Sequence, residues 1–168
     1  MYTVDSYKKP YARIVDGVTY ASDFLAASLA EGELIAVGMN KPEMLTELAT
    51  YRLEIETGGL ELEGGLRLLT DRQSQAQLNI AYTDLKYGLI PDTDLKAANT
   101  WEVVNLEQME PIAKALAVHR RACFRGERVV STAIENAKTL ALQVAINIQA
   151  DFAAAYQAAV AEVSEAAQ

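Results

Sequence analysis

The sequence is poor in the residues that most often build catalytic and metal-binding sites. Its 168 residues include one cysteine, one histidine and one tryptophan. A lone cysteine excludes a disulfide within the chain, and one cysteine with one histidine falls short of the four ligands of a structural zinc site. The motifs of serine hydrolases, zinc proteases and nucleotide-binding loops are also missing. We therefore expect a protein that is not an enzyme and that has no catalytic residues, no cofactor and no metal.

Positive charge is also in short supply. The chain has 15 lysines and arginines against 23 acidic residues, which gives a formal net charge of -8. Because nucleic acids and anionic lipids attract basic surfaces, we expect neither a nucleic-acid partner nor a membrane partner. The densest basic run, from His119 to Arg121 with Arg125 and Arg128 beyond it, is predicted to be a solvated or salt-bridged helix face.

The chain has no long uninterrupted hydrophobic run. Its most apolar stretch, residues 140–163, is broken by polar side chains at Gln143, Asn147, Gln149, Asp151 and Gln157. These interruptions argue against a membrane span. Residues 1–10 lack the apolar core of a secretory signal. Since 51% of the chain is hydrophobic, it has enough apolar material to build a core, and we expect a soluble protein made in the cytoplasm.

Turn signals predict a β-hairpin near the N-terminus. Asp16 and Gly17 separate two short, partly apolar segments, and this pair accepts the positive φ angles of a tight two-residue turn. Such a turn places Val15 opposite Val18. Beyond it, a short helix from Ser22 or Asp23 to Leu29 and a short strand over residues 34–38 are predicted, in a region whose pattern is ambiguous.

A second hairpin is predicted on either side of residues 63–65, a Glu-Gly-Gly sequence, where leucines alternate with charged residues. A two-residue loop would set Leu62 against Arg67 and would mix the two faces. A three-residue loop instead pairs Leu62 with Leu66 and Glu61 with Arg67. We therefore predict a loop of three residues, with a glycine in the left-handed region.

Helices are predicted before and after this second hairpin. The first begins at Asn40, with a proline two residues later, and ends by Glu56. The second begins with a capping box over residues 70–73, in which Thr70 is the cap. It ends at Gly88, the residue type that most often follows a helix.

A polar loop over residues 92–100 is predicted next, followed by Trp101–Val104 as a short strand or an extended anchor. Asn105 is predicted to cap a third helix that runs to about Arg125, where Gly126 bends or ends it. His119 and Cys123 lie four residues apart on the apolar stripe of this helix. That spacing suits an activated thiol or half of a metal site, but their position on the apolar stripe favours packing in the core.

The C-terminal part of the chain, from Val129 on, is rich in alanine and other helix formers. Its apolar residues repeat at alternating spacings of four and three: Ala141, Ala145, Ile148, Phe152, Ala155 and Ala159. This pattern predicts the seam of a coiled coil or of a packed bundle helix. Because alanine buries little area, we expect this helix to need several neighbours. The six residues are our candidate interaction surface, with a homo-oligomer as the expected assembly.

Together these patterns predict an α+β fold that is mostly helical. Two small β-hairpins pack on helices, and a long alanine-rich helix ends the chain. The parts we expect are an N-terminal hairpin region of residues 1–40, an α+β domain of residues 41–128, and a C-terminal helix of residues 129–168 for packing or oligomerisation.

Three segments in the middle of the chain resemble one family. They are residues 56–76, with the motif T-D-R-x-S-Q-A, residues 101–106, and residues 117–124, with the motif H-x-x-x-C-F. In that order and spacing they resemble a domain of unknown function found in tailed-phage and prophage proteins, often encoded near the tail fibres. The similarity covers about Leu48 to Arg128. It implies a location in or near a phage tail and supplies no catalytic residues.

The resemblance leads to three hypotheses for function. The first is a non-enzymatic tail structural protein of the virion, such as a baseplate, fibre-attachment or fibre component, whose partners are other phage tail proteins. The second is a tail-fibre assembly chaperone that is absent from the mature virion. The third is a host-factor binding module in the cytoplasm of the infected bacterium. None of the three uses a small-molecule substrate.

Overall fold

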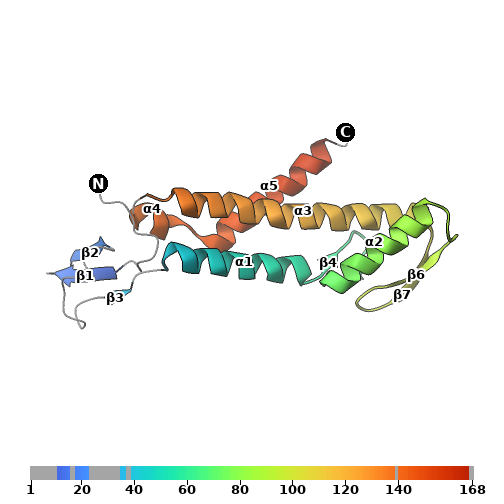
Figure 1. The fold of residues 1–168 in the computed structure, drawn as a ribbon, viewed down its shortest axis with the longest axis horizontal. Coiled ribbons are helices and arrows are strands. Elements are labelled where there is room, and N and C mark those ends of the chain that lie inside the picture. Colours follow the sequence, from blue (N-terminus) through green and yellow to red (C-terminus); the bar gives the residue numbers. More distant parts are fainter. Residues whose placement is uncertain (1–10, 16–17, 23–34, 37–38, 139, 167–168) are drawn as a thin grey trace. The chain divides into compact units, whose positions relative to one another are not determined.

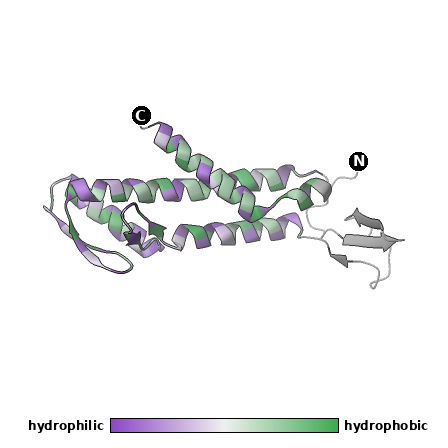
Figure 2. Cartoon of the chain, turned by 180° about the vertical axis from the view of Figure 1, so that it is seen from behind, coloured by the Kyte–Doolittle hydropathy of each residue, from purple (hydrophilic) through white to green (hydrophobic). Residues whose placement is uncertain are grey.

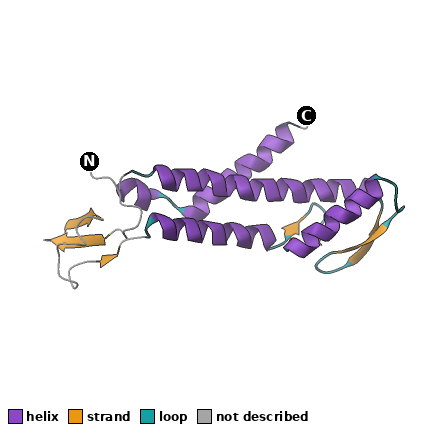
Figure 3. Ribbon diagram, viewed as in Figure 1, coloured by secondary structure: helices purple, strands orange, loops and turns teal. Residues whose placement is uncertain are grey.

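The structure of the protein is a computed structural model that describes residues 11–15, 18–22, 35–36, 39–138 and 140–166. Helices make up most of the described chain and the strands are short, as Figure 3 shows. The helices are α1 (Lys41–Thr57), α2 (Arg72–Lys86), α3 (Leu106–Asn136), α4 (Leu140–Ala145) and α5 (Ile148–Glu165). The strands are β1 (Tyr11–Val15), β2 (Val18–Ser22), β3 (Ile35–Ala36), β4 (Leu60–Glu61), β5 (Arg67–Leu68), β6 (Thr93–Lys96) and β7 (Trp101–Val104). The predicted class, α+β and mostly helical with a long C-terminal helix, is confirmed (Figure 1).

The chain divides into two compact units. The first comprises residues 1–50 and 126–155, and the second comprises residues 51–125 and 156–168. Helices α1, α3 and α5 each contribute residues to both units.

The first unit contains the N-terminal sheet, with strand order β2-β1-β3. Strands β1 and β2 pair antiparallel with Val15 opposite Val18, the register predicted for a two-residue loop. Strand β3 pairs with the other edge of β1, and the rest of the strand predicted over residues 34–38 lies outside the described residues. The helix predicted to end at Leu29 and the turn residues Asp16 and Gly17 lie outside the described residues.

In the first unit, the start of α1 lies against the end of α3. The Lys41 Nζ donates to the backbone carbonyl of Glu135 at 2.9 Å. Helix α1 begins next to Asn40, as predicted, and the Asn40 side chain caps it by accepting from the Glu43 amide at 2.9 Å. Helix α3 does not end at Gly126. A Cβ there would lie 3.0 Å from the ring of Phe152, so the glycine allows α3 and α5 to pack closely.

The C-terminal part of the chain is helical, but it is not one helix. Helix α3 ends at Asn136, α4 is short, and α5 follows after a break at residues 146–147. The break has a local cause, because the Asn147 side chain accepts from the Ala150 amide at 3.0 Å and so caps a new helix. Helix α5 is coloured largely as apolar in Figure 2, in keeping with its alanine content.

The second unit contains the hairpin of β4 and β5, with Leu60 opposite Leu68 and Glu61 opposite Arg67. The Leu62 amide donates to the Leu66 carbonyl at 2.8 Å, which confirms the predicted three-residue loop. Both glycines of the loop have positive φ angles. A core of apolar side chains fills this unit: Leu68, Leu78, Leu85, Leu95, Val104, Met109, Ile112 and Leu116.

The predicted cap of α2 is wrong by one residue. Asp71, not Thr70, caps the helix, and its carboxylate accepts from the amides of Gln73 and Ser74. The Thr70 hydroxyl is buried and accepts from the Gly59 amide at 2.8 Å instead. The end of α2 is as predicted, with Gly88 at φ 67° immediately after the cap residue.

The polar loop predicted over residues 92–100 is also partly wrong. Residues 93–96 form β6, which pairs antiparallel with β7, so that Lys96 lies opposite Trp101. Leu95 on β6 and Val104 on β7 are buried in the core. The burial of these two side chains stabilises the hairpin. The polar residues around them had made this segment resemble a loop in the sequence. Asn105 caps α3 as predicted, since its side chain accepts from the Gln108 amide at 3.1 Å.

Candidate functional site

The six residues of the predicted seam are divided between α4 and α5. Three of them, Ile148, Phe152 and Ala159, are buried within the chain itself, whereas Ala155 is half-buried and Ala145 is exposed. The side chain of Ala141 is outside the described residues. Because α4 and α5 are separate helices, these residues do not form one continuous seam. Their role in contacts with a second copy stays a prediction.

His119 and Cys123 are brought together in the second unit, and both are buried. The Cys123 Sγ lies 3.9 Å from His119 Nε2. That nitrogen also lies 3.3 Å from the backbone carbonyl of Glu56, which can only accept, so Nε2 donates. The other ring nitrogen, Nδ1, lies 2.8 Å from the hydroxyl of Tyr156. The histidine ring therefore links α1, α3 and α5.

The surroundings of Cys123 keep its thiol protonated. Burial, followed by the negative charge of Glu56, raises the pKa of the thiol to about 12, although the nearby Arg52 acts in the opposite direction. Burial also raises the pKa of Tyr156. Since the thiolate is the nucleophile in cysteine chemistry, this environment is opposite to that of a reactive cysteine. The pair occupies the core, as its place on the apolar stripe predicted.

A charged pair lies near Cys123, since Glu56 and Arg52 both act on the pKa of its thiol. Arg52 and Glu56 are ion-paired one turn apart on α1, and both side chains are largely buried. The Arg52 guanidinium also lies over the ring of Phe124, 4.9 Å from its centroid. Such stacking stabilises a buried guanidinium.

Part of the basic run on α3 is a salt-bridged face. Arg121 and Arg125 approach the same carboxylate oxygen of Glu162 on α5, at 2.7 and 3.2 Å. These hydrogen bonds hold the pKa of Glu162 below its ordinary value. Arg121 and Glu162 are exposed and Arg125 is half-buried, so the pairs contribute little to stability, although they join the two helices.

Two further expectations concern metals and membranes. Within the described part of the chain, no three side chains of His, Cys, Asp or Glu are grouped so as to hold a metal ion. Among the described helices, none combines the length and the apolar character needed to cross a membrane.

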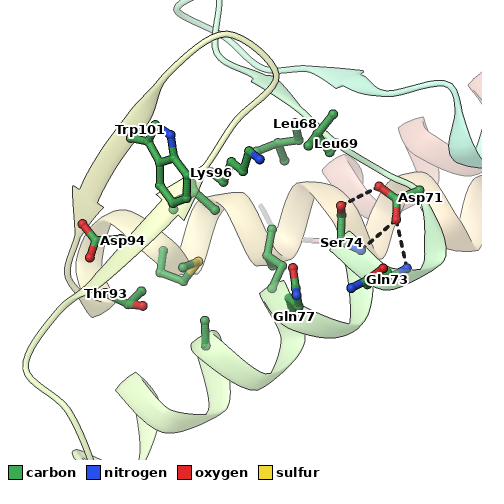
Figure 4. A pocket seen from close by; sticks show the side chains of 14 residues that line it. Leu68, Leu69, Asp71, Gln73, Ser74, Gln77, Thr93, Asp94, Lys96 and Trp101 are labelled. Carbon is green, nitrogen blue, oxygen red and sulfur yellow. Dashed lines mark hydrogen bonds between the residues drawn. The ribbon is translucent and has the colours of Figure 1, made fainter.

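The second unit has a cleft of about 590 Å³ between α2 and β6. Figure 4 shows its polar side chains, which come from the start of α2 and from β6. The lining residues are Leu68, Leu69, Asp71, Gln73, Ser74, Gln77, Leu78, Ala81, Thr93, Asp94, Leu95, Lys96, Trp101 and Met109. A volume of this size is within the range of ordinary ligand sites. We call it the α2–β6 cleft.

The α2 wall of the cleft is built around the helix cap. The Asp71 carboxylate accepts from the Ser74 hydroxyl at 2.5 Å, in addition to its two backbone amides. The hydrogen bonds that the Ser74 hydroxyl and the Ser74 amide donate to this carboxylate lower the pKa of Asp71. Asp71 therefore stays ionised and positions Ser74, while Gln77 continues the wall one turn further along α2. The arrangement is suited to hydrogen bonding.

The floor and rim of the cleft are apolar. Leu68, Leu78, Leu95 and Met109 line it from the core. At the rim, Trp101 is 66% exposed, and the Lys96 Nζ lies 5.5 Å from the centroid of its ring. An apolar floor beneath polar walls is typical of a binding site.

Sequence reasoning missed this cleft because it read residues 92–100 as a loop. One signal pointed to it, since Asp71 and Ser74 belong to the T-D-R-x-S-Q-A segment and Trp101 begins the next segment that carried the resemblance. The sequence does not show that these two segments lie close together in space.

No curated protein and no solved structure matches the chain. One family model matches it, over residues 39–168, and is described as a domain of unknown function, DUF4376. The match is longer than the similarity from Leu48 to Arg128 that the motifs indicated, and it includes the C-terminal helices. Both units and the whole α2–β6 cleft therefore draw on residues of this domain, and the chain belongs to the DUF4376 family.

Proposed function

We propose that the chain is a non-enzymatic structural protein of a bacteriophage tail, a baseplate, fibre-attachment or fibre component that binds neighbouring tail proteins. The observation that carries this proposal is the exposed apolar surface beside the α2–β6 cleft. Trp101 and Val103 on β7 are 66% and 64% exposed. Large exposed apolar side chains next to a cleft are typical of protein interfaces, where tryptophan is enriched.

The chemistry of the candidate polar groups, two of them buried and Asp71 exposed, supports a role without catalysis. The thiol of Cys123 is buried with a raised pKa, and His119 is held by Tyr156 and the Glu56 carbonyl. Asp71 is engaged as a helix cap. A nucleophile needs an accessible, activated atom and a base within reach, and these groups are committed to structure.

The phage setting rests on the resemblance of the three central segments to proteins encoded near tail fibres. Its test is the protein content of particles. Virions of the phage or induced prophage that carries the gene are purified on a density gradient, and the chain is quantified against the tail-tube protein by mass spectrometry. A fixed stoichiometric ratio supports the proposal.

Other results of the same measurement point to the other hypotheses. If the chain is absent from particles and its deletion yields particles without fibres, it is the assembly chaperone. If deletion leaves complete particles and lowers only the phage yield, the host-factor hypothesis replaces the tail assignment.

A further inference from the structure

We propose that the α2–β6 cleft binds an extended segment of a partner protein, which adds as a strand to the free edge of β6. This inference rests on the proposed binding function and specifies how the chain would hold its neighbour. Within the described residues, β6 pairs with β7 alone, so no strand is paired with its other edge.

The lining residues indicate that the cleft reaches the edge of β6. All four consecutive residues of the strand, from Thr93 to Lys96, line it. Successive side chains of a strand point to opposite faces, so a cleft over one face would be lined by alternate residues. Because every residue of β6 lines the cleft, the cleft reaches the backbone of the strand, and we infer that it includes the free edge, where a further strand would pair.

The backbone of β6 presents hydrogen-bonding groups to this edge. The Ala97 amide donates to the Thr100 carbonyl at 2.9 Å, so these two residues form a hydrogen-bonded pair at the end of the hairpin. Such pairs alternate along an antiparallel ladder. The backbone N–H and C=O groups of Asp94 and Lys96 therefore point away from β7. Each offers one N–H and one C=O to a strand in the cleft.

The same edge already holds a backbone partner at its end. Ala98, the next residue in the outward-pointing series, donates its amide to the Arg67 carbonyl at 2.8 Å. After β5, which ends at Leu68, the chain turns to the start of α2 and leaves the edge at Lys96 and Asp94 unpaired within the described residues. An added segment would continue the pairing that Arg67 begins.

The side chains of the cleft indicate the composition of the segment. A bound strand alternates its side chains between the apolar floor, with Leu78 and Met109, and the solvent. Two carboxylates, of Asp71 and Asp94, line the cleft against one ammonium group, of Lys96. The occupant is therefore a segment with alternating apolar residues and a basic residue. A partner protein suits this better than a second copy of a chain with a net charge of -8.

A peptide selection tests this proposal with the full-length chain. A library of random twelve-residue peptides is selected against the immobilised protein, and the enriched peptides are titrated by fluorescence anisotropy. We expect enrichment of alternating apolar sequences with lysine or arginine. The Asp94→Pro variant should bind them about tenfold more weakly, because proline removes an outward N–H that the β6–β7 ladder does not use.

The control is Val103→Pro, because Val103 lies directly opposite Asp94 and its N–H points outward from β7. This variant should keep the affinity within about twofold. Asp94→Ala separates the backbone effect from loss of the carboxylate, and thermal melts confirm that each variant folds. Equal affinity of the two proline variants, failure to enrich any peptide, or enrichment of sequences from this chain itself would overturn the proposal. None of these results bears on the particle stoichiometry, which tests the tail assignment separately.

Discussion

Cys123 illustrates at the scale of one residue how burial decides chemistry. A thiol with a histidine at 3.9 Å has the composition of a catalytic pair. In an exposed, electropositive site the histidine would help to form a thiolate, whereas here burial and the charge of Glu56 favour the protonated thiol. The same two residue types therefore serve packing.

This environment predicts slow labelling of Cys123 by the thiol reagent DTNB. In the folded chain at pH 8, labelling should be at least about a hundredfold slower than in urea, because it must wait for the protein to open. The measurement is the absorbance of the released thiolate. Rapid labelling of the folded protein would contradict the packing assignment and reopen the case for an active cysteine.

The raised pKa also fixes the sign of a pH effect. An unfolded chain loses the thiol proton near the ordinary pKa of 9.0, but the folded chain keeps it until about 12. Between these values the unfolded state binds fewer protons, so the contribution of Cys123 to stability falls as pH rises. Over this range the free energy of unfolding of the wild type should fall relative to that of Cys123→Ala as the pH rises.

At the scale of elements, Thr70 joins the end of α1 to the start of α2. Its buried hydroxyl accepts from the Gly59 amide, and its backbone carbonyl accepts from the Gln75 side chain at 2.7 Å. The first bond links the residues that follow α1 to the segment before α2, and the second is local to the start of α2.

Replacement of Thr70 by valine should lower the free energy of unfolding by about 1–2 kcal/mol. Valine has the same shape but no acceptor, so the Gly59 amide loses its partner in a partly buried position. Urea denaturation provides the measurement. Thr70→Ser, which keeps the hydroxyl, is the matched control and should retain most of the stability. Equal losses in the two variants would mean that the methyl group, rather than the hydrogen bond, is what matters.

These elements also explain what the sequence could predict. The hairpin register at Leu62 and Leu66, the helix end at Gly88 and the cap at Asn105 follow from residues within a few positions of one another. Thr70 was assigned as a cap because its true partner, Gly59, is eleven residues away. The α2–β6 cleft could not be predicted from the sequence for the same reason, since its two walls come together only through tertiary packing.

At the scale of the whole molecule, α5 contributes to each unit. In the first, its Phe152 is buried against Gly126. In the second, its Tyr156 bonds to His119 and its Glu162 pairs with Arg121. A helix with these contacts is part of the folded core. The alanine-rich sequence alone had suggested packing against several neighbours. Gly126, His119 and Arg121 of the same chain are among them, and contact with a second copy stays a prediction.

Truncation after Lys138 should therefore unfold the protein or destabilise it by more than about 3 kcal/mol, because loss of Phe152 alone removes a fully buried aromatic side chain. Circular dichroism melts measure the effect, and dye binding reports exposed apolar surface. A chain that stops after Glu165 is the control, since it keeps all of α5. If the truncated chain instead melts cooperatively at the wild-type temperature but has a lower mass by light scattering, α5 serves self-association, as the seam pattern predicted.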